Sequence, residues 1–348
     1  MLQRATVHDV AREAGVSLAT VDRVINRRPG VRPATAEKVE QAIRTLDFRR
    51  DVSASLLARS RDLHITFLIP NGRNEFMRHL ELAAAARVRP AKAERITIDL
   101  QTVKALDAKA LAKALDSLSP RLCDCAVIVA TDHALVRKAV ESAVRRGIAI
   151  VTLVSDLPGS ARRHFVGVDN VAAGRTAASL LGRFCPTGGI GVIAGSLGLQ
   201  DHRERLEGFR QVMEEEFPGH PLVGPVEGLD DNATTEKLAL KMLKAAPDLV
   251  GLYSLGAGNE GLLRALQKSG RAGKLRVVAH ELSEPTRKGL ASGMIDVVLD
   301  QNPEGEIRAA ITAARALAMG RPVDGDAEAI EIGIFLRDNL RQRETRQN

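Results

Sequence analysis

The chain has 348 residues, of which 45% are hydrophobic and 27% charged, a composition typical of a globular protein with two or three compact units. It contains no run of 18 apolar residues and no N-terminal apolar stretch of the signal-peptide type, so we expect a cytoplasmic protein without a transmembrane helix. The net charge is +7. Residues 1–61 carry 12 Lys and Arg against 7 Asp and Glu, whereas residues 62–336 are neutral in sum. A basic N-terminal module favours a polyanionic partner, of which nucleic acid is the usual one.

Two short amphipathic helices are predicted close to the N-terminus. Thr6 can cap the first, and Gly15 can end it where a left-handed residue is needed. Ser17 can cap the second, which should run to about Asn26. The joint is only a few residues long, so the two helices must cross steeply, as in a helix-turn-helix. Pro33 suits the start of a third helix. Apolar residues recur with helical spacing in all three: Val7, Val10, Ala11 and Ala14; Val21, Val24 and Ile25; Val39, Ala42, Ile43 and Leu46.

The outward face of the second helix is the predicted base-reading surface. It consists of Leu18, Ala19, Asp22 and Arg23. Arg23 is the strongest candidate, because one guanidinium can donate to O6 and N7 of guanine together. Leu18 and Ala19 can contact thymine methyl groups.

The segment from Thr6 to Phe48 contains the pattern V-x-D-V-A-x-x-A-G-V-S-x-x-T-V and resembles the DNA-binding headpiece of the lactose-repressor (LacI/GalR) family. The resemblance implies a transcription regulator whose second helix reads bases at its start, again through Leu18, Ala19 and Arg23. It also implies phosphate contacts from Thr6, Ser17, Thr20 and Asn26.

After the headpiece, Ser53 to Arg59 reads as a short segment that would be marginal as an isolated helix. The same resemblance implies a hinge helix that folds only on operator DNA, with one copy from each of two subunits in the minor groove. Leu57 matches the wedge between base pairs, and Ala54 matches the close helix–helix contact. An ordinary linker is the alternative.

Two positions depart from the family pattern. Asp22 stands where many members have Ser, and a carboxylate there would repel phosphate. It could instead pair with Arg23 or Arg27, or accept from a cytosine amino group. Arg50 stands where many members have Pro, which makes the start of the hinge less rigid but adds attraction for phosphate.

From residue 63 onward, eight apolar runs alternate with amphipathic segments: ITFLI, ITIDL, CAVIVA, IAIVTLV, IGVIA, LVGLYSL, LRVVA and DVVLD. This alternation predicts parallel sheets covered by helices. Two segments, GSLGLQDHRERLEGF and VVAHELSEPTRKGLASGMIDVVLDQNPEGE, resemble effector-binding segments of the same family and of periplasmic sugar-binding proteins. The expected fold is an all-α helix-turn-helix headpiece followed by an α/β periplasmic-binding-protein-like core of two parallel-sheet subdomains.

The expected division of the chain is as follows: headpiece 1–48; hinge or linker 49–61; effector-binding and dimerisation core 62–336; basic tail 337–348. Within the core, the N-subdomain takes residues 62–165 plus 298–323, and the C-subdomain takes 166–297 plus 324–336.

Polar residues follow most of the predicted strands, at the sheet edge where open α/β folds bind ligands. The expected effector-binding residues are Asn71, Asp132, Asp156, Arg203, Asn259, Glu281, Asp300 and Gln301. Carboxylates, amides and a guanidinium together suit a polyhydroxyl ligand such as a sugar, polyol or sugar acid. Arg203, Glu281 and Asp300 are the strongest choices. The resemblance supports Arg203 as an effector-binding Arg and places Glu281 where Asp is commoner.

Two features could indicate an enzyme. Residues 256–261 match G-x-G-x-x-G, but a lone match is a weak sign of dinucleotide binding, and the resemblance assigns this loop to the ligand pocket. Asp132 and His133 could form an acid–base pair, although a helix cap is the better interpretation. There is no G-x-S-x-G, H-E-x-x-H or P-loop motif, and the three cysteines fit no common zinc spacing. We expect no catalytic residue, cofactor or metal.

The predicted function is a ligand-responsive repressor of a carbohydrate or polyol utilisation operon. A homodimer would bind a pseudo-palindromic double-stranded operator. The C-terminal tail lacks the leucine heptads of a tetramerising coiled coil, which favours a dimer. Alternatives are a sugar-uptake binding protein and an α/β oxidoreductase. Whether the ligand is an inducer or a corepressor is open.

Overall fold

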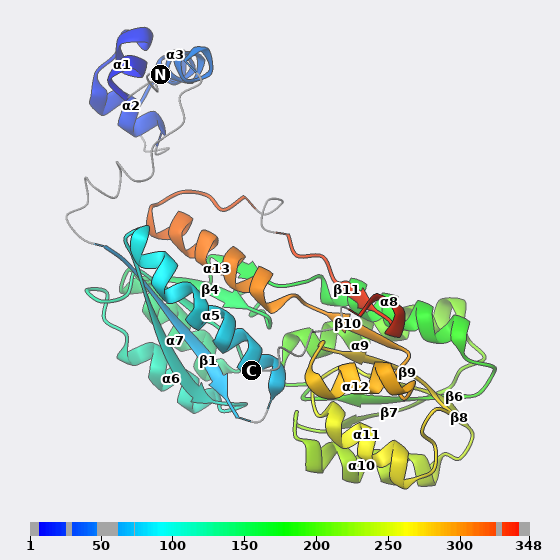
Figure 1. Ribbon diagram of the computed structural model, residues 1–348. Coiled ribbons are helices and arrows are strands. Elements are labelled where there is room, and N and C mark those ends of the chain that lie inside the picture. The colour runs from blue at the N-terminus through cyan, green and yellow to red at the C-terminus, as the bar shows by residue number, and fades with distance from the viewer. Residues whose placement is uncertain (1–6, 26–29, 47–61, 73, 325–328, 341–348) are drawn as a thin grey trace, which may run out of the picture.

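The computed structural model describes residues 7–25, 30–46, 62–72, 74–324 and 329–340 (Figure 1). The N-terminal unit consists of three helices, α1 (Val7–Ala14), α2 (Leu18–Ile25) and α3 (Pro33–Thr45). Their apolar stripes meet in one small core built from Val10, Val21, Val39 and Ala42, with Ala11 at its edge. Gly15 has φ 63°, a left-handed value that suits glycine, and turns the chain between α1 and α2. The predicted helix-turn-helix is confirmed.

Several residues of the predicted DNA interface lie outside the described residues. These are Thr6 and Asn26 in the headpiece, and Arg50, Ala54 and Leu57 in the hinge segment. The hinge interpretation therefore stays a prediction.

The first lobe of the core is a parallel five-stranded sheet with the order β2-β1-β3-β4-β5. Its elements run in chain order as β1 (Leu63–Asn71), α5 (Glu75–Ala93), β2 (Ile96–Lys104), α6 (Ala108–Ser117), β3 (Cys125–Ile128), α7 (Ala134–Arg145), β4 (Ala149–Leu153) and β5 (His164–Val166). Alternate residues of each strand enter opposite cores, so that Phe67 packs on one face and Leu68 on the other. Helix α5 covers the first face together with a later helix, α13 (Pro303–Ala318), and α6 and α7 cover the second (Figure 1).

The second lobe contains a six-stranded sheet with the order β11-β10-β9-β8-β6-β7, in which only β11 is antiparallel to its neighbour. Its elements are α8 (Asn170–Phe184), β6 (Gly189–Ala194), α9 (Gln200–Glu216), β7 (Leu222–Glu227), α10 (Asn232–Ala245), β8 (Leu249–Ser254), α11 (Asn259–Lys268), β9 (Arg276–His280), α12 (Glu284–Ser292), β10 (Val297–Asp300), β11 (Gly333–Phe335) and the 3-10 turn Arg337–Asn339. Helices α8 and α9 cover one face, and α10, α11 and α12 cover the other.

All eight predicted apolar runs are strands, and the predicted two-lobed α/β architecture is confirmed. Three further strands, β5, β7 and β11, were not predicted. Strands β5 and β11 have only three residues each, and Gly224-Pro225 interrupts β7, so none of them shows a continuous apolar run.

The chain crosses between the lobes later than the sequence placed it. Strand β10 ends at Asp300 and pairs with β9 and β11 in the second sheet, whereas α13 packs on the first sheet. The crossing therefore lies after Asp300 and not at residue 298. An apolar run alone does not reveal which of two sheets it joins.

Helices α8 and α9 lie unusually close together because each contributes a glycine to the contact. A Cβ on Gly174 would overlap the backbone carbonyl of Arg205, and a Cβ on Gly208 would overlap that of Val171. This close approach holds the segment that carries Arg205 against α8.

Gly174→Ala tests this close packing. We expect it to lower the free energy of unfolding by about 1–3 kcal/mol through overpacking, although alanine is the better helix former by about 1 kcal/mol. Urea denaturation measures the change. The neighbouring exposed substitution Arg175→Ala should cost less than about 0.5 kcal/mol. Equal stability of wild type and Gly174→Ala would show that the two helices can separate without cost.

Candidate functional site

The predicted base-reading face of α2 is on the surface. Leu18 is 42% exposed, and Ala19 and Arg23 are also exposed. Ser17 accepts the Thr20 N–H at 3.2 Å through Oγ and shares a hydrogen bond with Thr20 Oγ1 at 2.9 Å, which fixes the start of the helix. The side chains predicted to contact bases therefore project from a helix whose first turn is held by the Ser17–Thr20 hydrogen bonds.

The two lobes of the core meet where strands of both sheets end. Arg203 of α9 donates to Asp132, which follows β3, at 2.8 Å, and Asn74 donates to Asp230 at 3.2 Å. The Gln200 N–H donates to Ser155 Oγ at 3.1 Å. The lobes are thus bridged by polar contacts at the edge where open α/β folds bind ligands.

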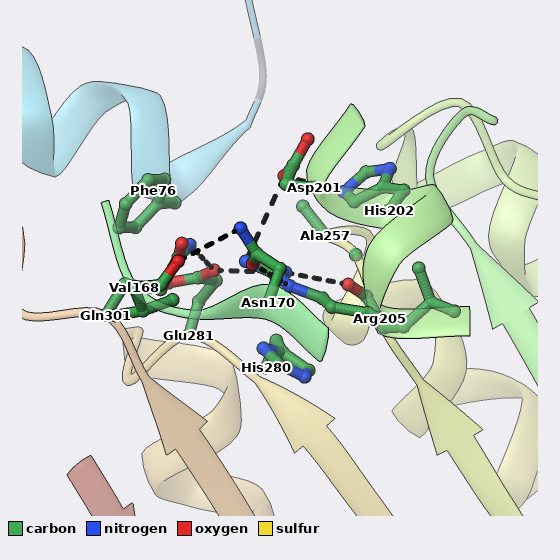
Figure 2. Close-up of polar contacts among 12 residues, drawn as sticks. Phe76, Val168, Asn170, Asp201, His202, Arg205, Ala257, His280, Glu281 and Gln301 are labelled. Carbon is green, nitrogen blue, oxygen red and sulfur yellow. Dashed lines mark hydrogen bonds and ion pairs between the residues drawn. The ribbon is translucent and has the colours of Figure 1, made fainter. Parts of the chain in front are cut away.

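Between the lobes lies a buried polar cluster centred on Arg205 of α9, which is 1% exposed (Figure 2). Its Nε donates to Asn170 Oδ1 and its Nη1 to the Leu255 carbonyl, both at 2.9 Å. Carboxylate oxygens of Asp201 and Glu281 lie at 3.9 and 3.8 Å from the guanidinium. The cluster therefore holds one fixed guanidinium between two acids.

Glu281 reaches the cluster through an unusual backbone conformation. Its φ is 72°, a left-handed value that is uncommon for a residue with a Cβ. The Glu281 N–H donates to the Leu299 carbonyl at 2.8 Å, and the Glu281 carbonyl accepts from Thr286 Oγ1 at 2.7 Å. These bonds hold the kink at the end of β9 and aim the carboxyl at Arg205 and Gln301, which donates to it at 2.6 Å.

Many polar atoms of the cluster have no hydrogen-bond partner among the described residues. They are Asp201 Oδ1, Arg205 Nη2, His280 Nδ1, Glu281 Oε2, Gln301 Oε1 and both carboxyl oxygens of Glu306. Leaving a buried polar group unsatisfied costs about 1–3 kcal/mol. So many such atoms in one place indicate a site whose hydrogen bonds a small polar molecule completes.

Burial dominates the electrostatics of the cluster. It raises the pKa of Glu281 to about 8, although the Arg205 charge opposes the shift, and it raises the pKa of Glu306 well above the usual range. Burial, followed by the charges of Arg205 and His202, lowers the pKa of His280 well below its usual range. His280 is therefore neutral, with Nε2 hydrogen-bonded to Tyr253 OH at 2.9 Å.

The structure brings only part of the predicted effector set together. Glu281 and Gln301 lie in the cluster. Asn259 is buried beside it, but it accepts from Ser254 and donates to the His280 carbonyl, which leaves it a supporting role. Asp300 accepts backbone N–H groups from Leu282 and Asn302 at the edge of the cluster.

The other four predicted residues lie elsewhere. Asp156 forms a buried ion pair with Arg162 inside the first lobe. Asn71 is exposed and lines a separate interlobe cavity of about 170 Å³. Asp132 and Arg203 pair with each other, and the Arg203 side chain is 37% exposed.

Five residues of this cluster were not in the predicted effector set: Arg205, Asn170, Asp201, His280 and Glu306. A signal for Arg205 was present. Successive helical residues are 100° apart, so Arg203 and Arg205 lie on opposite faces of α9. The buried stripe of Leu206, Phe209 and Val212 is on the Arg205 side. Glu306 gave no signal, because an acid in the first turn of a helix is usually exposed.

The features that could indicate an enzyme or a metal site have structural roles. In residues 256–261, the Ala257 and Gly261 N–H groups already donate to Asp230 and Asn232, so they are not available to a pyrophosphate. His133 caps α7 by accepting the Leu135 N–H at 3.1 Å, as the cap interpretation predicted. In the described ranges, no three His, Cys, Asp or Glu side chains are grouped to hold a metal, and no helix could span a membrane.

Two family descriptions match the chain. "Bacterial regulatory proteins, lacI family" matches residues 6–51, and "Periplasmic binding protein domain" matches residues 65–322.

Curated relatives match about a fifth of the chain. Catabolite control protein A of Priestia megaterium is 43% identical over 75 residues, which cover 22% of this chain and 23% of that protein. The HTH-type transcriptional regulator RegA of Clostridium acetobutylicum is 43% identical over 72 residues, 21% of this chain and 22% of that protein. The matched segment thus spans less than a quarter of either relative.

Solved structures match about four fifths of the chain. The glucose-galactose binding protein GanP of Geobacillus stearothermophilus has a TM-score of 0.72 at 20% identity, covering 81% of this chain and 99% of that chain. A solute-binding protein of Burkholderia graminis in complex with D-arabinose has a TM-score of 0.72 at 21% identity, covering 82% and 98%. At such identities the likeness shows the fold alone.

Proposed function

This chain belongs to the periplasmic binding protein domain family and carries a lacI-family regulatory domain ahead of it, and from this premise we propose that it is a ligand-responsive, DNA-binding transcription regulator. The main observation behind this proposal is that an exposed helix-turn-helix precedes a two-lobed core with unsatisfied polar atoms buried between its lobes. The matched relatives named as a control protein and as a transcriptional regulator support this proposal.

For the DNA side, we assign base contacts to Arg23, Leu18 and Ala19, which are exposed on α2, and phosphate contacts to Ser17 and Thr20 at its start. Thr6, Asn26 and the hinge residues Ala54 and Leu57 complete the proposed interface on the family resemblance alone. A homodimer would place two such units on a pseudo-palindromic operator.

For the ligand side, we propose a small polyhydroxyl molecule bound between the lobes. Among the described residues, acceptor atoms of Asp201 and Glu281 and one donor atom of Arg205 have no partner, as hydroxyl groups require. We move the proposed guanidinium contact from Arg203 to Arg205, because Arg203 is engaged with Asp132. Neighbouring structures whose titles name D-arabinose and D-allose support a sugar-sized ligand.

Ligand binding can alter DNA affinity only through a difference in ligand affinity between two states of the protein. A ligand that completes the cluster touches both lobes and so favours the bridged arrangement. We propose that this shift releases the operator, which makes the protein a cytoplasmic repressor of a carbohydrate or polyol operon.

The test is a DNA-binding measurement with the purified full-length chain. DNA selected from a random pool by the protein should bind at least about 10³ times more tightly than unselected DNA at physiological salt. A screen of sugars and polyols should then find a compound that weakens this binding. Absence of any preference between selected and random DNA would refute the regulator.

A further inference from the structure

Glu306 is the one carboxyl that the first lobe's layer of helices contributes to the cluster. It lies in the first turn of α13 and is 0% exposed. Neither of its carboxyl oxygens finds a hydrogen-bond partner in the part of the chain that the structure describes. An acid in this state costs stability unless something bound beside it supplies donors.

The cluster as a whole holds more acids than bases. Three buried carboxyl groups, on Asp201, Glu281 and Glu306, lie within electrostatic range of the single guanidinium of Arg205. The carboxyls of Asp201 and Glu281 lie 3.9 and 3.8 Å from that guanidinium, beyond hydrogen-bond distance. Arg205 already donates hydrogen bonds from Nε to Asn170 and from Nη1 to the Leu255 carbonyl.

The neighbouring histidines do not restore the balance. His280 is held neutral by burial, and His202, whose Nε2 lies 3.6 Å from Asp201 Oδ2, can match no more than that one acid. Asp300, at the edge, adds a further acid. The buried acids therefore need protons or a cation as partners.

We propose that the ligand of this site carries a protonated amine in addition to its hydroxyl groups, as an amino sugar does, and that the ammonium group lies between Glu306 and Glu281. This rests on the proposed ligand-binding function and narrows its ligand class. An ammonium has three donors and no acceptor, which matches the free oxygens on these two residues. A sugar acid would instead bring a further carboxylate to a place that already holds three buried acids.

An organic cation fits better than a metal ion. Within the described residues, no three acid, His or Cys side chains converge closely enough to ligate a metal. The donor Nη2 of Arg205, the amide oxygen of Gln301 and Nδ1 of His280 are also without partners, and these suit the hydroxyls of an organic ligand.

The same assignment predicts a release of protons when the ligand binds. Burial raises the pKa of Glu281 to about 8, so this carboxyl holds a proton near pH 7 in the absence of ligand, and burial also raises the pKa of Glu306 well above its usual range. The charges that face them are those of Arg205, Asp201 and Asp300. A bound ammonium lowers both pKa values, so its binding should release protons to the buffer.

Isothermal titration of the full-length protein at pH 7 with matched trios of hexoses tests the proposal. The probes are glucose, glucosamine and glucuronate, with the corresponding galactose and mannose sets. In at least one trio the amino member should bind about tenfold more tightly than the neutral one, and the acid should not bind. Titrations in phosphate and HEPES should differ in apparent enthalpy, as proton release requires.

Glu306→Gln removes the charge and keeps the shape. It should weaken binding of the amino sugar about tenfold and binding of the neutral sugar less than about threefold. Glu304→Gln is the matched control, because Glu304 is exposed on the same turn of α13. If Glu306→Gln does not fold, Glu281→Gln gives the same comparison.

If the neutral or acidic sugar binds more tightly than the amino sugar in every trio, the proposed amine group is ruled out, but a polyhydroxyl ligand is not. Equal weakening of amino and neutral sugars by Glu306→Gln would also overturn it. If no probe binds while the protein still prefers its selected DNA, the proposals of an amine-bearing and of a sugar-sized ligand are both wrong. The DNA-binding function is unaffected by that result.

Discussion

Arg205→Lys should reduce ligand affinity by about 10- to 100-fold while DNA binding without ligand stays within about twofold of wild type. Arg205 is buried, and its guanidinium serves Asn170, the Leu255 carbonyl and one free donor position at the same time. A lysine keeps the charge beside the acids, which avoids leaving them unpaired, but it cannot reproduce the planar fork. Titration of ligand into the variant, and DNA binding with and without ligand, measure both effects.

Arg203→Ala is the matched control for this prediction. The two residues are two positions apart on α9 but point to opposite sides, and Arg203 forms a partly exposed ion pair with Asp132. Such pairs contribute about 0–1 kcal/mol, so ligand affinity should fall by no more than about fivefold. A larger loss with Arg203→Ala than with Arg205→Lys would return the guanidinium contact to Arg203.

The fold was predictable because its signals are local. Each long strand is a run of apolar residues bounded by polar segments, and the glycine between α1 and α2 marks the turn of the headpiece. The short edge strand β11 was missed because it is held by pairing with β10, a contact between residues far apart in the sequence.

The site was harder to predict because several of its parts look ordinary in the sequence. Glu281 and Gln301 were predictable, since they directly follow strands of one parallel sheet. Asp156 also follows a strand, but a local ion pair with Arg162 holds it inside the first lobe and outside the cluster. Glu306 reaches the cluster only because the chain crosses lobes after β10, and no local pattern encodes a crossing.

Helical phase decides which of Arg203 and Arg205 points into the core. Both are arginines of the segment DHRERLEGF, and position after a strand does not separate them. Helical phase does, because only Arg205 shares the face that carries Phe209 into the core. A residue should therefore be placed on a helix face before it is given a binding role.

Arg23→Ala should weaken binding to the selected DNA by about 5- to 150-fold, the equivalent of about 1–3 kcal/mol for a lost bidentate base contact. Binding to random DNA should change by less than about threefold, because nonspecific binding depends mainly on phosphate contacts. Arg23 is exposed on α2, away from the headpiece core, so the variant should fold as wild type does. Fluorescence anisotropy with selected and random duplexes gives both affinities.

Arg12→Ala is the control, since Arg12 is an exposed headpiece arginine on α1 that pairs with Asp9 at 3.4 Å. It should leave the ratio of selected to random binding unchanged. Repeating the titrations at several salt concentrations separates the two kinds of contact. Loss of a phosphate contact reduces the slope of log affinity against log salt concentration by about one, whereas loss of a base contact leaves this slope unchanged. Equal weakening on both DNAs with a reduced salt slope would make Arg23 a phosphate contact and transfer the reading of bases to Leu18, Ala19 or Asp22.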